Sequence, residues 1–168
     1  MRIFASLAFL IVGTLAAHAR DVEGWQSYNN AAFGYSVELP ISEFAPQPGP
    51  TRTNGMTLLE VGGQAEISVY GGVNAKGTDP AKLAELLGGA GQVQKVTYRA
   101  GGSRWIVLSG YYAGSEATAG GREIFYTKLM FSRDQSRISA FEISYPEADK
   151  ARFDPVVMHL ERTLEPPR

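Results

Sequence analysis

The sequence contains no cysteine and only two histidines among 168 residues. Without cysteine the protein has no disulfide, no iron–sulfur cluster, no cysteine-ligated zinc and no thiol nucleophile. The formal net charge of −1 lacks the excess of cations that nucleic-acid binding requires, so nucleic acid is not the expected partner. The length suits one domain, and 44% apolar with 20% charged residues is typical of a folded globular chain.

The N-terminal segment has the three parts of a secretory signal peptide. Arg2 supplies the positive charge, residues 3–15 are almost wholly apolar, and Ala17-His18-Ala19 places small residues at the −3 and −1 positions. The apolar run is shorter than the roughly 20 residues of a membrane span, so an uncleaved anchor is the less favoured alternative. We therefore predict a signal peptide over 1–19, a single α+β domain over 20–168 without a membrane span, and a periplasmic or secreted location.

Local patterns predict the first strands and a short helix. In residues 33–39 large apolar side chains alternate with small or polar ones, which is the period of a half-buried strand. Two further strand-like runs, 56–61 and 65–73, are separated by a glycine-rich turn and are interpreted as a hairpin. A helix is expected from Pro80, because Asp79 can cap its free N–H groups and proline suits the first helical position.

The second half of the chain predicts a strand meander and a final helix. The four expected strands cover about 93–99, 103–112, 122–131 and 138–145. Their short connections favour antiparallel pairing. The last helix is expected from Pro155, with Asp154 as N-cap and a staple between Phe153 and Met158, although helical turns from Glu147 could precede it. The order predicts an α+β fold, an antiparallel sheet of about six to seven strands with one short internal helix and a C-terminal helix packed on it.

Strand register is chosen by asking which pairing sorts the apolar side chains onto one face. The sorting is best when Leu129 lies opposite Phe141 in the last hairpin. The same register places Lys128 opposite Glu142, a favourable charge pair. A slip of one residue would put Leu129 opposite Ala140 and mix the two faces.

One face of this predicted sheet combines aromatic rings, cations and hydroxyl groups. To define this face, the hairpin of the strands 93–99 and 103–112 is given the register that sorts its apolar side chains best, which sets Arg99 opposite Ser103. Tryptophan, tyrosine and arginine are typical of recognition surfaces, because they offer a large area with a polar end. The candidate binding residues on this face are Lys95, Arg99, Trp105, Ser109, Tyr111, Tyr126, Lys128 and Glu142. The alternative is an ordinary sheet face covered by a helix or by the proline-rich loop of residues 41–54. A helix packed there would bury Trp105 and Val107.

The residue patterns of common catalytic centres do not occur in the sequence. His159 is the only histidine left after signal cleavage, and its neighbours on the helix are apolar or charged, so no Ser-His-Asp triad is expected. With one histidine and no cysteine, no metal site is expected. The glycine run at 88–91 follows a helix and lacks the spacing of a phosphate-binding loop, so it is interpreted as a helix stop and no cofactor is expected. Glu66, Glu123 and Glu142 lie on predicted strands, which leaves a carboxylate pair for hydrolysis open.

Short motifs along the chain resemble a known group of proteins. They are Tyr28-x-Asn30, Phe33-Gly34-Tyr35-Ser36-Val37, Leu39-Pro40, Trp105-Ile106-Val107-Leu108-Ser109-Gly110 and Ile143-Ser144-Tyr145-Pro146. These segments resemble small secreted proteins of unknown function from Gram-negative bacteria, and the order of elements is similar to the PsbP-like α/β/α sandwich. The resemblance implies a non-enzymatic binding or accessory role, and it assigns no functional residue.

Three kinds of function remain after these exclusions. The favoured one is an exported, non-catalytic binding or accessory protein of the bacterial cell envelope, whose partner is an envelope protein or a small amphiphilic ligand. One alternative is a carboxylate-based hydrolase, which requires two acidic side chains within about 10 Å of each other in one cleft. The other is an oligomer-forming structural protein that pairs through an exposed edge strand.

Overall fold

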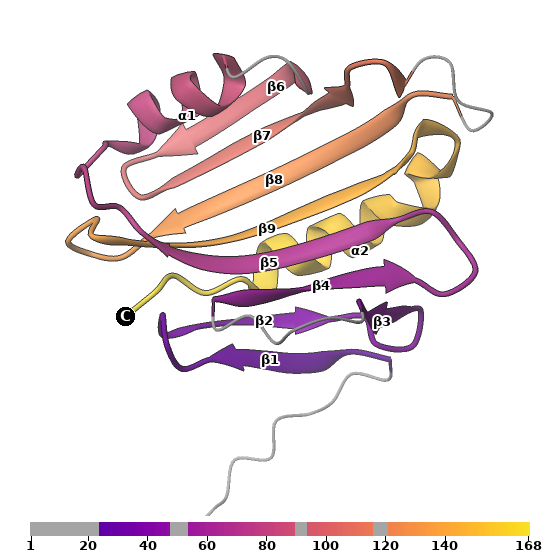
Figure 1. The fold of residues 1–168 in the computed structure, drawn as a ribbon, viewed down its shortest axis with the longest axis horizontal. Helices are drawn as coiled ribbons and strands as arrows, with labels where there is room; N and C mark the ends of the chain where they lie inside the picture. The colour runs from indigo at the N-terminus through magenta and orange to yellow at the C-terminus, as the bar shows by residue number, and fades with distance from the viewer. Residues whose placement is uncertain (1–23, 48–53, 90–93, 116–120) are drawn as a thin grey trace, which may run out of the picture.

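A computed structural model describes residues 24–47, 54–89, 94–115 and 121–168 (Figure 1). These residues form a seven-stranded antiparallel sheet, a two-stranded sheet and two α-helices. The predicted α+β class, with its short internal helix and its C-terminal helix, is confirmed. The predicted signal peptide and part of the 88–91 glycine run lie outside the described residues.

The seven strands follow the spatial order β3-β4-β5-β9-β8-β7-β6. They are β3 (Phe44–Pro46), β4 (Gly55–Glu60), β5 (Glu66–Val73), β6 (Gln94–Gly102), β7 (Trp105–Tyr112), β8 (Glu123–Phe131) and β9 (Arg137–Pro146). The small sheet pairs β1 (Gln26–Asn30) with β2 (Tyr35–Leu39). The helices are α1 (Pro80–Gly89) and α2 (Lys150–Thr163), the latter entered through the 3-10 turn η2 (Glu147–Asp149). None of the helices in the described ranges is long and apolar enough to span a bilayer.

The two helices cover opposite faces of the large sheet. Leu129 of β8 packs in a small cluster with Leu83 of α1. The next residue back, Lys128, instead donates a hydrogen bond to the carbonyl of Glu161 on α2. Because successive side chains of a strand point to opposite faces, α1 and α2 lie on different sides of the sheet (Figure 1). We call these sides the α1 face and the α2 face.

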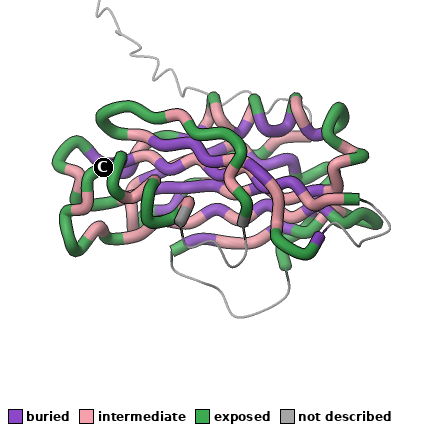
Figure 2. The backbone as a smooth tube through the Cα atoms, turned by 90° about the horizontal axis from the view of Figure 1, so that it is seen from above, coloured by how far each residue is buried: buried purple, intermediate pink, exposed green. Residues whose placement is uncertain are grey.

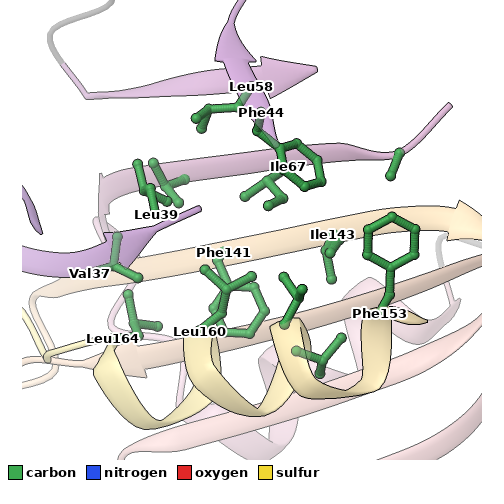
Figure 3. Packing of buried hydrophobic residues seen from close by; sticks show 14 of the residues in the cluster. Val37, Leu39, Phe44, Leu58, Ile67, Phe141, Ile143, Phe153, Leu160 and Leu164 are labelled. Atoms are coloured by element: carbon green, nitrogen blue, oxygen red, sulfur yellow. The ribbon is translucent and has the colours of Figure 1, made fainter. Parts of the chain in front are cut away.

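The main hydrophobic core lies on the α2 face, between the sheet, α2 and β2. Figure 3 shows side chains from all three meeting there, and Figure 2 shows buried residues running along the strands with exposed ones at the turns. The core side chains labelled in Figure 3 are Val37, Leu39, Phe44, Leu58, Ile67, Phe141, Ile143, Phe153, Leu160 and Leu164. A core of this extent stabilises the fold without a disulfide.

The last helix does not begin at Pro155, the favoured start, but follows the alternative in which helical turns from Glu147 precede it. The helix α2 begins at Lys150, so Pro155 lies inside it and Asp154 is not its N-cap. The earlier start lets Phe153, which is fully buried, pack against the rings of Phe44 and Tyr145. This burial outweighs the missing N–H of the proline. The staple is also wrong, because Met158 is 60% exposed while Phe153 is buried.

Residues Gln26–Asn30, for which the sequence predicted no strand, form β1. Strand β1 pairs with β2 over its whole length. Just before it, the ring of Trp25 stacks on His159 of α2 with 3.8 Å between centroids. His159 Nε2 lies 2.5 Å from the carboxylate of Glu38, while Arg162 donates to its Nδ1 at 3.1 Å. These contacts tie the small sheet to α2 and give His159 a structural role.

The register chosen for the last hairpin is wrong by one residue. Leu129 lies opposite Ala140, and Lys128 lies opposite Phe141. The reason is that β8 carries large apolar side chains on both faces, with Phe125 on the α1 face and Ile124 on the α2 face, both buried. Sorting apolar side chains onto one face therefore cannot choose between the two registers. The connecting turn, with Gln135 at a φ of +59°, sets the observed one.

The register chosen for the β6–β7 hairpin is also wrong. Gly102 pairs with Trp105, so Ala100-Gly101-Gly102 belongs to β6 and the turn has only two residues. The register then shifts between Val96 and Tyr98, which marks a β-bulge at Thr97. A two-residue turn is the most favoured hairpin connection, and the bulge absorbs the mismatch that it creates.

A buried carboxylate fixes the β4–β5 turn to α2. The side chain of Glu60 is 8% exposed and accepts hydrogen bonds from the N–H groups of Gln64 and Ala65, both at 3.1 Å. It also accepts a hydrogen bond from the Arg152 guanidinium. Burial alone would raise the pKa of Glu60, but these donors and the charge of Arg152 together hold the pKa below its ordinary value of 4.5.

This lowered pKa predicts a pH-dependent contribution to stability. Because the pKa of Glu60 is lower in the folded state, its contribution is complete above about pH 5 and is lost as the pH falls through the folded-state pKa. Glu60→Gln should therefore be less stable than wild type at pH 7, and the difference should shrink as the pH is lowered from 5 to 3. Urea unfolding at each pH measures the difference. In an Arg152→Ala background, the difference in stability between proteins with and without Glu60→Gln should be smaller at pH 7, because the charge that lowers the pKa of Glu60 is gone. Parallel stability curves for wild type and Glu60→Gln would contradict this account.

Candidate functional site

The structure places most of the predicted binding residues on one face, and it is the face that α2 covers. Lys128 contacts α2, and its partner on β7 is Val107, so both lie on the α2 face. By strand alternation and direct pairing, that face also carries Lys95, Trp105, Ser109, Tyr111 and Tyr126. Val107 is buried, as expected for a covered face, whereas Trp105 is half-buried.

Arg99 and Glu142 lie on the opposite, α1 face. In the observed register Glu142 pairs with Thr127, whose hydroxyl donates to the Glu142 carboxylate at 2.5 Å. Tyr112 donates to the other carboxylate oxygen. Arg99 lies beside the last turn of α1, where its guanidinium would obstruct any side chain at Gly88. The predicted cross-strand pair of Lys128 with Glu142 is therefore wrong, because the two side chains project from opposite faces of the sheet.

The helix does not cover the whole α2 face, and a groove remains beside it. The groove has a volume of about 530 Å³ and lies between α2 and strands β6, β7 and β8. We call it the tyrosine groove, because four tyrosine rings line it. Its lining from the sheet is Thr97, Tyr98, Ser109, Gly110, Tyr111, Ile124, Tyr126 and Tyr145, and its lining from α2 is Lys150, Asp154, Val157, Met158 and Glu161.

The mouth of the tyrosine groove exposes large apolar groups. Tyr98 on β6 is 54% exposed, and Met158 on α2 is 60% exposed on the other side of the groove. Both are unusually accessible for side chains of their size, and together they flank a hollow of ligand size. The geometry suits an apolar or aromatic group that inserts between the two.

Two of the groove tyrosines, Tyr126 and Tyr145, have raised pKa values. Burial raises the pKa of Tyr126, and the neighbouring carboxylate of Glu161, with which its hydroxyl bonds, raises it further. Burial, reinforced by the charge of Asp154, likewise raises the pKa of Tyr145 to about 12. Both hydroxyls stay neutral, and the oxygen of Tyr126, whose O–H is engaged by Glu161, can still accept a hydrogen bond.

The charged groups of the groove belong to two ion pairs, one within α2 and one that joins α2 to β8. Lys150 bonds to Asp154 at 2.8 Å, and Lys128 lies 3.6 Å from Glu161. Asp154 and Glu161 are seven residues apart on the helix, which separates their backbones by about 10 Å. The arrangement suits recognition of an apolar group, and both carboxylates are engaged in ion pairs within the protein.

The edge of the groove near β8 is pinned by a second charged cluster. Arg122 bonds to Glu147 at 2.7 Å and stacks over the ring of Tyr111 at 3.8 Å. The Tyr111 hydroxyl donates to the same carboxylate at 3.1 Å. The orientation of Tyr111 is therefore set before any ligand binds, which lowers the conformational cost of binding.

Sequence reasoning found Ser109, Tyr111 and Tyr126 but missed other groove residues. Tyr98 and Tyr145 were missed because the chosen registers did not place them on the face of the candidate binding residues. The helical side of the groove was missed because the helix was started too late. Once α2 begins at Lys150, the spacing of its groove residues follows the period of one helix face, and this periodicity was the available signal.

The fold is an antiparallel sheet with a helix on each face, and it is of the PsbP-like class. The solution structure of cyanobacterial PsbP (CyanoP) from Synechocystis sp. PCC 6803 matches with a TM-score of 0.61 at 10% identity, covering 92% of this chain and 98% of that one. The Saccharomyces cerevisiae Ran-binding protein Mog1p matches with a TM-score of 0.58 at 10% identity, covering 84% of this chain and 94% of that one. No protein-family model and no curated protein matches the sequence. The predicted PsbP-like fold is confirmed, and at this identity the likeness concerns the fold alone.

Proposed function

We propose that this protein is an exported, non-catalytic binding or accessory protein of the bacterial cell envelope. Its partner is an envelope protein or an amphiphilic small ligand, and the tyrosine groove is its binding site. The observation that carries the proposal is the groove itself, a hollow of about 530 Å³ flanked by the exposed side chains of Tyr98 and Met158. Export is supported by Arg2, the apolar run of residues 3–15 and Ala17-His18-Ala19.

The chemistry of the groove supports binding. Tyrosine rings supply large, rigid contact areas at a low cost in conformational entropy, and their hydroxyls orient a bound group. The two acidic side chains that line the groove are held by Lys150 and Lys128, which favours recognition over acid–base chemistry. The similarity of fold to a Ran-binding protein supports the use of such a scaffold for binding another protein.

A charge placed at the mouth of the groove tests the proposal. Met158→Arg puts a guanidinium where the apolar side chain stands, and because that side chain is 60% exposed, the change leaves the buried face of α2 intact. The amount of partner captured from a periplasmic extract of the encoding bacterium should be about tenfold or more lower than with wild type, because the apolar contact of the methionine is lost.

Leu86→Arg is the matched control. Leu86 lies on α1 and is 54% exposed, so the change in charge and the exposure are closely similar, but the site lies on the other face of the sheet. Quantitative mass spectrometry of the captured proteins compares the two variants with wild type. Equal recovery of every protein by wild type, Met158→Arg and Leu86→Arg would reject the groove as the binding site.

A further inference from the structure

Strand β6 is an edge strand whose outer side is open. It is last in the order of the large sheet and pairs only with β7. In the part of the chain that the structure describes, no strand pairs with its other side. Along β6 the side chains of Lys95, Thr97, Tyr98 and Arg99 are all exposed. Its outer row of N–H and C=O groups can therefore pair with a further strand.

A hollow adjoins β6 on each face of the sheet. On the α2 face, Thr97 and Tyr98 form the rim of the tyrosine groove. On the α1 face, a second hollow of about 430 Å³ lies between α1 and the end of β6. Its lining combines small residues, Ala81 and Ala84 on α1 and Gly101-Gly102 on β6, with the charged side chains of Glu85 and Arg99. The small residues let a neighbouring chain approach closely.

These features match the requirements of strand addition. The side chains of an added strand alternate between the two faces of the sheet, and specificity arises when hollows receive the alternate side chains. The bulge at Thr97 helps here, because after it Tyr98 points to the groove while Arg99 points to the α1 face. We propose that an extended segment of the partner protein pairs with the outer edge of β6. This inference rests on the proposed function, since the tyrosine groove supplies one of the two hollows.

Charge determines which strand fits. Lys95 and Arg99 are the only charged residues of β6, and among the described residues neither has an acidic side chain within ion-pair distance. A second copy of this chain would add two more cations at the junction, which disfavours self-pairing. The favoured occupant is a segment of another protein that has one acidic residue on each face, opposite Lys95 on the α2 face and Arg99 on the α1 face, and an aromatic or aliphatic side chain on the α2 face for the groove.

Selection of peptides tests the inference with a defined probe. Random peptides of about twelve residues, long enough to span β6, are displayed on phage and selected on the purified protein. The enriched peptides should be proline-free, with one acidic residue on each face of the added strand and an aromatic or aliphatic residue on the face that meets the groove. Lys95→Glu should weaken their binding about three- to tenfold, whereas Lys76→Glu, which makes the same charge change at an exposed loop position, should leave it unchanged.

Backbone methylation of an enriched peptide is the sharpest readout. In an antiparallel pair only every second N–H of a strand points to its neighbour. Methylation of one alternate set of peptide amides should abolish binding, and methylation of the other set should not. Hydrogen exchange should show new protection at amides of β6 on binding.

The possible failures are distinguishable from one another. Equal effects of both methylation sets, or protection that spares β6, would overturn strand addition. If the peptide nevertheless fails to bind Met158→Arg, the tyrosine groove remains the binding site and the proposed function stands. Failure to enrich any peptide also counts against the inference. Protection of β6 that rises with protein concentration alone would overturn it in favour of pairing with a second copy.

Discussion

Phe153→Ala should lower the free energy of unfolding by about 3–5 kcal/mol, the usual loss when a fully buried phenylalanine is truncated. Phe153 has no exposed surface, and its ring packs against Phe44 of β3 at 6.2 Å and Tyr145 of β9 at 4.9 Å between centroids. The side chain thus joins α2 to two distant strands of the sheet. Because these strands are held apart by the rest of the core, the cavity cannot collapse fully, which adds to the cost.

Urea unfolding followed by circular dichroism measures this loss. The matched control is Ile41→Ala, which truncates an apolar side chain that is 49% exposed and should change stability by less than about 0.5 kcal/mol. A loss below about 1 kcal/mol in Phe153→Ala would contradict the placement of α2. The early start of α2 would then lose its physical reason, since burial of Phe153 is what offsets the internal Pro155.

Gly110→Ala should lower the free energy of unfolding by about 1–3 kcal/mol, through a clash with backbone. A Cβ at Gly110 on β7 would lie 1.9 Å from the carbonyl oxygen of Lys95 on β6, closer than any real contact. No side-chain rotation relieves it, because the obstructing atom belongs to the neighbouring strand. The β6–β7 pairing must open at the bulge, so hydrogen exchange of β6 should accelerate more than that of β5 and β9.

The control for this variant is Gly72→Ala. There the nearest atom to the added Cβ is 3.2 Å away and belongs to the flexible side chain of Ile138, so a small shift suffices. We expect a smaller change in stability and no selective exchange at β6. Similar losses in Gly72→Ala and Gly110→Ala would mean that the close approach at the bulge is not what constrains β6.

The positions of the elements were largely predictable, because the signals are local. Asp79 illustrates this. Its carboxylate accepts a hydrogen bond from the N–H of Lys82 at 2.9 Å, so it caps α1 as the Asp79-Pro80 pair predicted. The alternation of residues 33–39 likewise appears as β2. The start of α2 was not predictable by the same means, because a proline at 155 is a strong local signal that tertiary burial overrules.

The candidate site was only partly predictable, because it depends on register. Tyr111 and Tyr126 were expected on one face and line the same groove. Glu142 was expected beside Lys128, yet the one-residue shift sends the two to opposite faces. With buried apolar residues on both faces of β8, hydrophobic sorting has little power, and the turn geometry decides.

The amino-acid sequence was sufficient for the α+β class, the absence of cysteine chemistry and the order of the two helices and of every strand except β1 and β3, since each follows from composition or from neighbours along the chain. Which side of the sheet α2 covers, and how much of it, depends on contacts between residues far apart in the sequence. Phe153, Arg152 and His159 hold α2 against β3, the β4–β5 turn and β2. That placement leaves the strip of sheet beside β6 uncovered, and so the tyrosine groove and the open edge exist only in the folded chain.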